Sequence, residues 1–177
     1  MAPRPLRGRV AYIFGDDFDV DQIVGVKNIK VQDIDKLVSL ALEQFDAEFK
    51  ARLRPGDFLL GGCNFGYGHP HFPTMRAMRK LGIAAVIAES FFPVYWRGEI
   101  SNGFPQVACE GIATTLTRWE EVEIDFGTSV VRRLASGETL AFQGYTASEL
   151  AILAAGGFRP WLANTMAAER GEENHHG

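Results

Sequence analysis

The chain alternates between short apolar runs and stretches in which apolar residues recur every three or four positions. A run of four to eight mostly apolar residues is typical of a strand that is buried on both faces. Three such runs are Arg9–Phe14, Asp57–Leu60 and Ile83–Ala88. Between the first two runs, apolar residues at helical spacing predict one amphipathic helix, capped by Asp33 and running to about Leu53.

The second half of the chain predicts further short elements. Two short helices are predicted at Thr74–Leu81 and Phe91–Ile100. Segments rich in β-formers and separated by glycine turns predict an antiparallel set of strands at Val122–Phe126, Val130–Leu134 and Thr139–Gly144. A capping-box pattern opens a last helix at Thr146, and Gly156 and Gly157 end it. Strands and helices mixed in this order predict an α/β fold.

Length and composition are those of an ordinary globular protein. The chain has 177 residues, of which 46% are hydrophobic and 23% charged. We predict a single domain over residues 1–162 and a disordered polar tail over residues 163–177. The net charge of −4, with no basic cluster among aromatics, gives no reason to expect nucleic acid. No apolar run reaches the length of a membrane span or forms a signal core, so we predict a cytoplasmic protein.

A glycine-rich stretch, residues 61–73, lies between a predicted strand and a predicted helix. Its sequence is G-G-C-N-F-G-Y-G-H-P-H-F-P, and its glycines let the backbone take positive φ and approach a ligand closely. Pro73 suits the first turn of the following helix. The stretch therefore predicts a loop that brings His69 and His71 to a helix N-terminus, a place that favours anions. The same stretch is equally compatible with a plain surface turn.

Four aspartates fall within six residues after the first predicted strand, in the sequence G-D-D-F-D-V-D-Q. A solvated turn or a helix cap accounts for such a cluster, and the functional alternative is a polar lining for a site. Acidic clusters also bind calcium or magnesium, but the spacing of an EF-hand is missing, so we predict no metal site. Asp19 and Asp21 are the candidate binding residues in this cluster.

Four short motifs carry a resemblance to a known family. They are G-D-D-F-D-V-D-Q-I at residues 15–23, G-C-N-F-G-Y-G at 62–68, L-G-I-A-A-V-I-A-E-S-F at 81–91 and N-G-F-P at 102–105. In this order they resemble the small subunit of isopropylmalate dehydratase and its relatives, the swivel domain of the aconitase superfamily. The family's motifs are G-D-N-I-D-T-D-Q-I, G-E-N-F-G-C-G, L-G-I-x-A-V-I-A-x-S-F and N-G-L-P. The similarity covers residue 10 to about residue 157.

The resemblance implies an aconitase swivel-like β/β/α domain that docks on a large subunit carrying a 4Fe-4S cluster. Such a cluster needs cysteine thiolates as ligands. This chain has only Cys63 and Cys109, so we expect no cofactor in this chain and the cluster in the partner. Two cysteines also fit a reducing compartment. We therefore expect activity only together with the large subunit.

The chain departs from the family in the centre of the loop. Family members follow the last glycine with S-S-R-E, where this chain has His69, Pro70, His71 and Phe72. The resemblance implies that the first serine is the base and that the arginine binds a substrate carboxylate. A histidine can act as a base near neutral pH, and a protonated histidine can bind a carboxylate. We therefore predict His69 as the catalytic proton-transfer residue and His71 as a substrate binder.

Further binding residues are predicted around these two. The segment from Lys27 to Val31 falls where the family carries a loop that sorts substrates by their side group. Lys30 there offers a charge for a distal carboxylate, although a solvated lysine accounts for it as well. The remaining predicted binding residues are Asn64, Tyr67, Arg97, Asp19 and Asp21.

Two functions are compatible with these observations. The first is the small subunit of a hydro-lyase that acts on a malate-like hydroxy acid together with a large subunit, whose cluster iron would withdraw the hydroxyl. The second is a non-catalytic swivel-domain protein that binds a small carboxylic acid or regulates a partner. The motif retained around the two histidines favours the enzyme. We expect no nucleic acid and no membrane among its partners.

Overall fold

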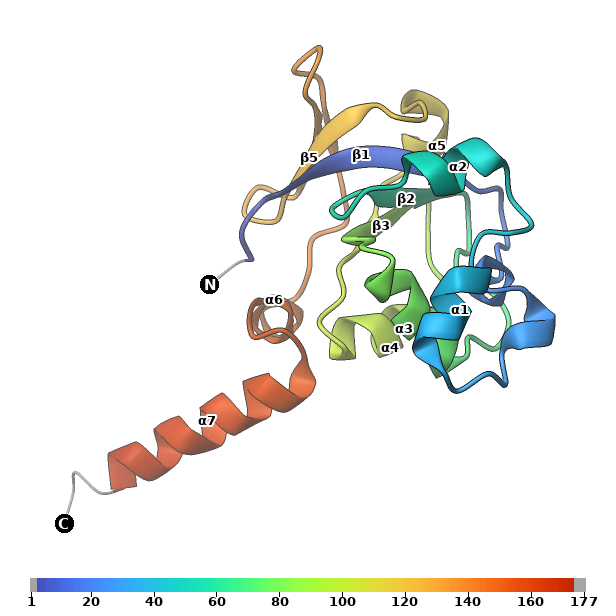
Figure 1. The fold of residues 1–177 in the computed structure, drawn as a ribbon. Helices are drawn as coiled ribbons and strands as arrows, with labels where there is room; N and C mark the ends of the chain where they lie inside the picture. Colours follow the sequence, from blue (N-terminus) through green and yellow to red (C-terminus); the bar gives the residue numbers. More distant parts are fainter. Residues whose placement is uncertain (1–2, 174–177) are drawn as a thin grey trace.

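The computed structural model describes residues 3–173, which form a seven-stranded mixed sheet with helices packed against it (Figure 1). The strands lie side by side in the order β4-β3-β2-β1-β5-β6-β7. Their bounds are β1 Leu6–Ile13, β2 Phe58–Gly61, β3 Ala85–Ala88, β4 Gln106–Ala108, β5 Glu121–Asp125, β6 Val130–Arg133 and β7 Thr139–Ala141. Strands β1 to β4 pair in parallel, whereas β5 pairs antiparallel with both β1 and β6, and β6 pairs antiparallel with β7. The predicted α/β fold and the antiparallel set are confirmed.

Helices and tight turns connect the strands. The 3-10 turns are η1 Val20–Ile23 and η2 Val26–Asn28. The α-helices are α1 Ile34–Leu40, α2 Ala47–Arg52, α3 Phe72–Lys80, α4 Pro93–Ser101, α5 Ile112–Thr115, α6 Ala147–Ala154 and α7 Phe158–Glu173. The predicted helices at Thr74–Leu81 and Phe91–Ile100 correspond to α3 and α4. Strand β4 and helix α5 were not predicted, because three or four residues are too few to show a period.

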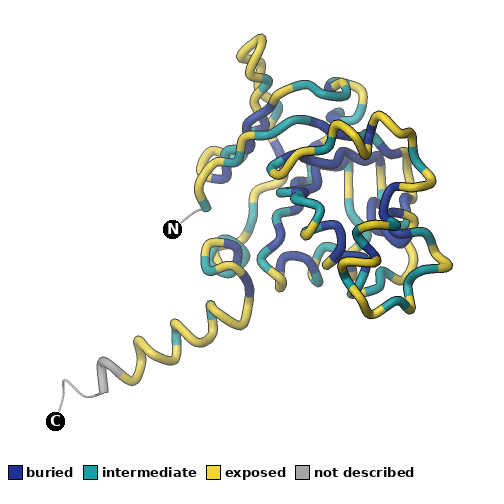
Figure 2. Tube along the Cα trace, viewed as in Figure 1, coloured by how far each residue is buried: buried dark blue, intermediate teal, exposed yellow. Residues whose placement is uncertain are grey.

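Apolar side chains fill both faces of the parallel strands. Neighbouring residues in a strand point to opposite faces, so Val10 and Ala11 belong to different apolar clusters. The cluster with Ala11 packs against helical residues such as Leu37 and Met78. The cluster with Val10 includes Val131 of the antiparallel half. Figure 2 shows this buried centre as the dark part of the chain. Burial on both faces explains why these strands are continuous apolar runs.

The prediction of a single helix from residue 33 to 53 is wrong, because the structure has two short helices there, α1 and α2, with a break between them. Leu42, in the break, has a φ of 66°, and its backbone N–H donates to the carbonyl of Ile23 at 2.7 Å. Asp46 then caps α2 by accepting the backbone N–H of Phe49. The apolar spacing runs through the break because Leu37, Leu42 and Phe49 are all buried against the same core.

The disorder predicted over residues 163–177 differs from the structure, in which α7 continues to Glu173. Helix-favouring residues such as alanine, glutamate and arginine dominate this segment, which explains a helix despite its polarity. Figures 1 and 2 show α7 extending away from the sheet and exposed along most of its length. Residues 174–177 of the predicted tail lie outside the described residues. Within residues 3–173, no helix is both long and apolar enough to cross a membrane.

Candidate functional site

The glycine-rich loop joins β2 to α3 and leaves the carboxyl end of a buried parallel strand. Asn64, Gly66 and Gly68 have φ of 58°, 82° and 93°. A Cβ at Gly66 would stand 2.3 Å from Cγ of Tyr95, so only glycine fits between the loop and this buried ring. The backbone N–H of Gly66 donates to the carbonyl of Phe18 at 2.9 Å, which ties the loop to the acidic segment.

The acidic segment, residues 15–22, lies directly against this loop. Asp16 Oδ1 accepts the backbone N–H of Cys63 at 2.7 Å. Asp17 Oδ1 accepts a hydrogen bond from the side-chain amide of Asn64 at 2.7 Å. Two of the clustered carboxylates therefore brace the glycine-rich loop. Their mutual repulsion is offset by these N–H donors, which carry partial positive charge.

Asp21 and His71 form the most buried polar contact of the site. Oδ2 of Asp21 lies 2.6 Å from Nδ1 of His71, and Oδ1 of Asp21 accepts the backbone N–H of His71 at 3.1 Å. The side chain of Asp21 is 5% exposed and that of His71 is 39% exposed. Both oxygens of Asp21 are thus engaged by His71, so this carboxylate faces the histidine rather than the solvent.

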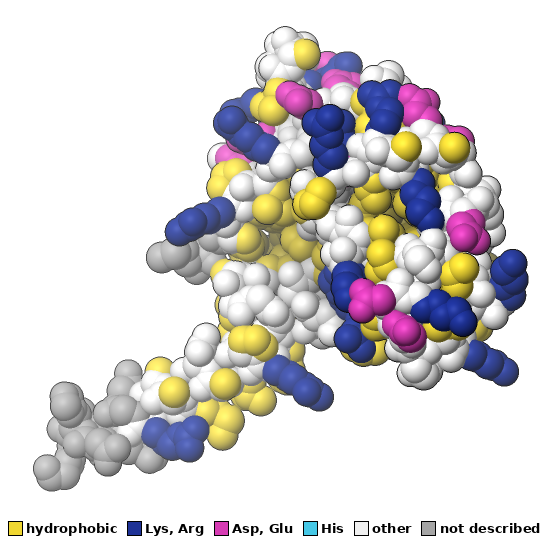
Figure 3. Space-filling model, in the orientation of Figure 1, with side chains coloured by type: hydrophobic (Ala, Val, Ile, Leu, Met, Phe, Trp, Pro, Cys, Tyr) yellow, Lys and Arg dark blue, Asp and Glu magenta, His cyan; other side chains and the backbone are white. Residues whose placement is uncertain are grey.

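His69 occupies the outer side of the same loop. Its residue is exposed, and its ring centroid lies 5.6 Å from that of His71, at an interplanar angle of 69°. Within residues 3–173 the side chain of His69 makes no hydrogen bond or ion pair. On the face drawn in Figure 3, basic and acidic side chains are mixed and no histidine is visible.

The other predicted binding residues divide into two groups. Tyr67 lies on the loop, is 50% exposed and packs edge-on against Phe92 with centroids 5.8 Å apart. Asp19 lies next to the loop, since its Oδ2 is 3.6 Å from where a Cβ at Gly68 would stand. Lys30 and Arg97 are exposed, and within the described part of the chain no hydrogen bond, ion pair or ring contact joins their side chains to the loop. The structure therefore places Tyr67 and Asp19 together at the loop, whereas within the described residues the side chains of Lys30 and Arg97 make no such contact with it.

Two residues that support the loop were not among the predicted site residues. Ser90 Oγ accepts the backbone N–H of Asn64 at 2.8 Å, and the buried Tyr95 ring fills the space behind Gly66. Ser90 falls within the motif at residues 81–91, so its position in that motif was the available signal. Tyr95 carried no such signal, because its contact with Gly66 arises only when β2 and β3 lie side by side.

A buried ion pair supports the two helices behind the loop. Nη1 of Arg79 on α3 donates to the two carboxylate oxygens of Glu99 on α4, at 2.8 and 2.7 Å. Burial raises the pKa of Glu99, while the charge of Arg79 opposes that rise. Burial, with the charge of Glu99, also raises the pKa of Tyr95 well above its ordinary value. The ion pair therefore fixes α3 against α4 in an environment where a lone charge would be costly.

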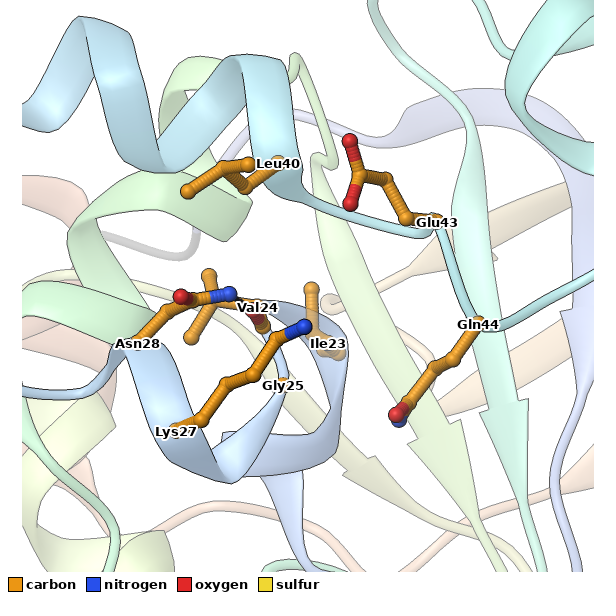
Figure 4. Close-up of a pocket in the computed structure, with 8 residues that line it drawn as sticks. All are labelled: Ile23, Val24, Gly25, Lys27, Asn28, Leu40, Glu43 and Gln44. Carbon is orange, nitrogen blue, oxygen red and sulfur yellow. Dashed lines mark hydrogen bonds between the residues drawn. The ribbon is translucent and has the colours of Figure 1, made fainter.

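A cavity of about 220 Å³ opens beside the 3-10 turns η1 and η2, and Figure 4 shows the side chains around it. Lys27 and Asn28 lie on one side of it, and Leu40 and Glu43 lie on the other. The residues that line it are Ile23, Val24, Gly25, Lys27, Asn28, Leu40, Glu43 and Gln44. The cavity therefore adjoins the predicted substrate-sorting segment and not the histidines.

Within residues 3–173, no group of three or more His, Cys, Asp or Glu side chains is arranged to hold a metal ion. Cys63 is exposed on the loop, whereas Cys109 is buried in the core, and neither forms a disulfide. Burial raises the pKa of the Cys109 thiol to about 11, so this side chain stays protonated near neutral pH.

Comparison with known proteins gives one consistent result. A crystal structure of 3-isopropylmalate dehydratase (leuD) from Methanocaldococcus jannaschii matches with a TM-score of 0.83 and 27% identity, over 96% of this chain and 99% of that one. The isopropylmalate/citramalate isomerase small subunit of the same organism is 32% identical over 162 residues, 92% of this chain and 96% of its own length. The 3-isopropylmalate dehydratase small subunit 1 of Methanopyrus kandleri is 35% identical over 152 residues, 86% of this chain and 89% of its own length. No model of a protein family matches this chain.

The fold, its length and its relatives define a small subunit of a hydro-lyase. The naming of these relatives as small subunits implies a large-subunit partner. The chain belongs to the family of 3-isopropylmalate dehydratase small subunits. The predicted swivel-type α/β fold and the predicted hydro-lyase class are thereby confirmed.

Proposed function

We propose that this chain acts on a malate-like hydroxy acid as the small subunit of a dehydratase or isomerase, together with a cluster-bearing large subunit. Relatives named for isopropylmalate and citramalate support this substrate class, because both compounds are substituted malates. The observation that carries the proposal is the glycine-rich loop, which holds two imidazoles at the N-terminus of α3. A cytoplasmic location remains a prediction that accompanies this function.

Dehydration of such an acid requires a base for the proton alpha to a carboxylate and a group that binds a carboxylate. The two histidines supply both kinds of group on one loop. The sequence assigns the proton to His69 and the carboxylate to His71. Asn64, Tyr67 and Asp19 lie on or beside the same loop, which supports a binding role for them.

We assign the 4Fe-4S cluster to the large subunit because the described residues of this chain do not provide the ligands that such a cluster needs. Cys63 is exposed and Cys109 is buried in the core, and no third cysteine exists in the sequence. A 4Fe-4S cluster held by thiolates needs more ligands than this. The part of the reaction proposed for this chain is therefore the binding of the substrate and the movement of its proton.

Reconstitution with the large subunit tests this function. We expect the complex to convert a malate-like acid to its alkene, while the chain alone stays inactive. The double variant His69→Ala/His71→Ala should lower kcat by about 100-fold or more, the scale of a lost general base. Alkene absorbance follows turnover, and circular dichroism checks that the variant folds. Turnover by the chain alone, or native turnover by the double variant, would contradict the proposal.

The second candidate is a non-catalytic swivel-domain protein that binds a small carboxylic acid. The replacement of S-S-R-E by His69, Pro70, His71 and Phe72 favours it, since the family's serine and arginine are both missing. Calorimetry with malate-like acids separates the two candidates. Tight binding by the chain alone, with no turnover by the reconstituted complex, would favour the second.

Lys30→Leu is expected to change the relative kcat/KM between substrates with charged and apolar side groups by about 10-fold, because a distal carboxylate would lose its countercharge. The matched control is Lys36→Leu, which removes an exposed lysine on α1. Steady-state kinetics on two malates with different side groups gives the ratio. An unchanged ratio, with native stability, would remove Lys30 from the binding residues.

A further inference from the structure

The two histidines of the loop differ sharply in how they are held. His71 is partly buried, and the buried carboxylate of Asp21 makes hydrogen bonds with both its Nδ1 and its backbone N–H. His69 is exposed, and within residues 3–173 its side chain has no hydrogen-bonding partner. A general base works best when its ring orientation and its tautomer are fixed before the substrate arrives. Only His71 meets this condition.

The carboxylate of Asp21 fixes which nitrogen of His71 carries the proton. A carboxylate accepts hydrogen bonds only, so in the neutral ring the proton sits on Nδ1, where it is donated to Oδ2 across 2.6 Å. The lone pair of the neutral ring is then on Nε2. This is the arrangement by which an aspartate prepares a histidine as a base in unrelated hydrolases.

The position of His71 in the fold also places it where an anion binds. His71 is the N-cap residue of α3, a helix of nine residues. The N-terminus of a helix carries partial positive charge, which favours an anion such as a substrate carboxylate. Asp21 contacts His71 directly, and Oδ1 of Asp19 accepts the backbone N–H of Asp21 at 2.9 Å. The exposed imidazole of His69 lies beside them.

We propose that His71 is the proton-transfer residue of the dehydratase and that Asp21 is its positioning residue, so the two histidines exchange the roles that the sequence assigns. This inference rests on the proposed function. The C–H bond alpha to a carboxylate breaks, its electron pair forms the carbon–carbon double bond, and the proton moves to Nε2 of His71. The C–O bond breaks and its electron pair stays with the hydroxyl group, which leaves as hydroxide. Asp21 stabilises the imidazolium until the imidazolium releases its proton, and this proton and the hydroxide together make up the water that is eliminated. His69 then binds the substrate carboxylate with the N-terminus of α3.

Single variants in the reconstituted complex separate the roles. We expect His71→Gln to lower kcat by about 100-fold or more, and His69→Gln to raise KM with less than about a 5-fold change in kcat. The reverse pattern would overturn the proposal.

Asp21→Asn tests the positioning role. The asparagine can still accept the backbone N–H of His71 with its oxygen, but its NH₂ group then faces Nδ1 and moves the ring proton to Nε2. We expect kcat to fall by about 100-fold with KM changed by less than about 3-fold. Asp35→Asn is the matched control, because it removes an exposed carboxylate that pairs with Lys80. A purely structural role would lower the free energy of unfolding and leave kcat of the folded variant unchanged.

A measurement without turnover separates failure of this inference from failure of the proposed function. Nitrogen-15 NMR of the folded chain should show the His71 proton on Nδ1 in the native protein and on Nε2 in Asp21→Asn. If the complex shows no dehydratase activity, the proposed function and the catalytic role of His71 are both wrong. The NMR result still shows whether Asp21 positions the ring of His71. A native His71 without a proton on Nδ1 would overturn that role as well.

Discussion

Replacing Arg79 with methionine is expected to lower the free energy of unfolding by about 3–5 kcal/mol at neutral pH. Arg79 makes two charge-assisted hydrogen bonds to Glu99, whose side chain is completely buried. Without its partner, this carboxylate is left charged in an apolar environment. Urea unfolding of the isolated chain, followed by circular dichroism, measures the loss.

The pH dependence of this loss identifies its cause. Burial already raises the pKa of Glu99 above its ordinary value of 4.5, and removal of Arg79 raises it further. A carboxyl group whose pKa is higher in the folded state makes folding less favourable as pH rises above the value of the unfolded chain. The deficit of Arg79→Met should therefore be largest near neutral pH and shrink as pH falls toward about 4.5.

Two further variants serve as controls for this prediction. Arg76→Met removes an exposed arginine from the same helix and should cost less than about 0.5 kcal/mol. The double variant Arg79→Met/Glu99→Met should recover most of the loss, since no buried charge is left unpaired. A deficit below about 1 kcal/mol for Arg79→Met, or a deficit independent of pH, would contradict this account of the ion pair.

The parts of the fold that could be predicted are those whose sequence shows a period or a continuous apolar run. The buried strands and helices α3 and α4 are of this kind. The break at Leu42 could not be predicted, because it depends on a hydrogen bond to Ile23 nineteen positions earlier. Helical spacing of apolar residues continues across the break, so periodicity alone gives one helix where two are present.

The candidate site could be predicted as a loop but not as a set of contacts. The glycine spacing and the two histidines indicate the loop, and the resemblance to a family brings the acidic segment into the same site. The contact between Asp21 and His71 joins residues 50 positions apart. It exists because β1 and β2 are parallel neighbours, which places the loops that leave their carboxyl ends side by side. The sequence alone therefore could not show that His71 is hydrogen-bonded to a buried carboxylate whereas His69 is exposed.

Gly66→Ala is expected to destabilise the chain by about 2–5 kcal/mol and to abolish activity of the reconstituted complex. The φ of 82° costs an alanine about 1–2 kcal/mol. Its Cβ would also stand 2.3 Å from Cγ and 2.5 Å from Cβ of Tyr95, and overpacking costs about 1–3 kcal/mol more. Tyr95 is 1% exposed and cannot move aside without disturbing the core. The loop must therefore shift, and the histidines shift with it.

Gly68→Ala separates the two causes, because it shares the backbone conformation without the clash. Its φ is 93°, but the atom nearest to a Cβ there, Oδ2 of Asp19, is 3.6 Å away. We expect a loss of about 1–2 kcal/mol for Gly68→Ala, and the difference between the two variants reports the contact with Tyr95. Urea unfolding under identical conditions gives both values. Equal losses would mean that the Tyr95 ring does not determine the course of the loop, and the packing argument for glycine at position 66 would then be wrong.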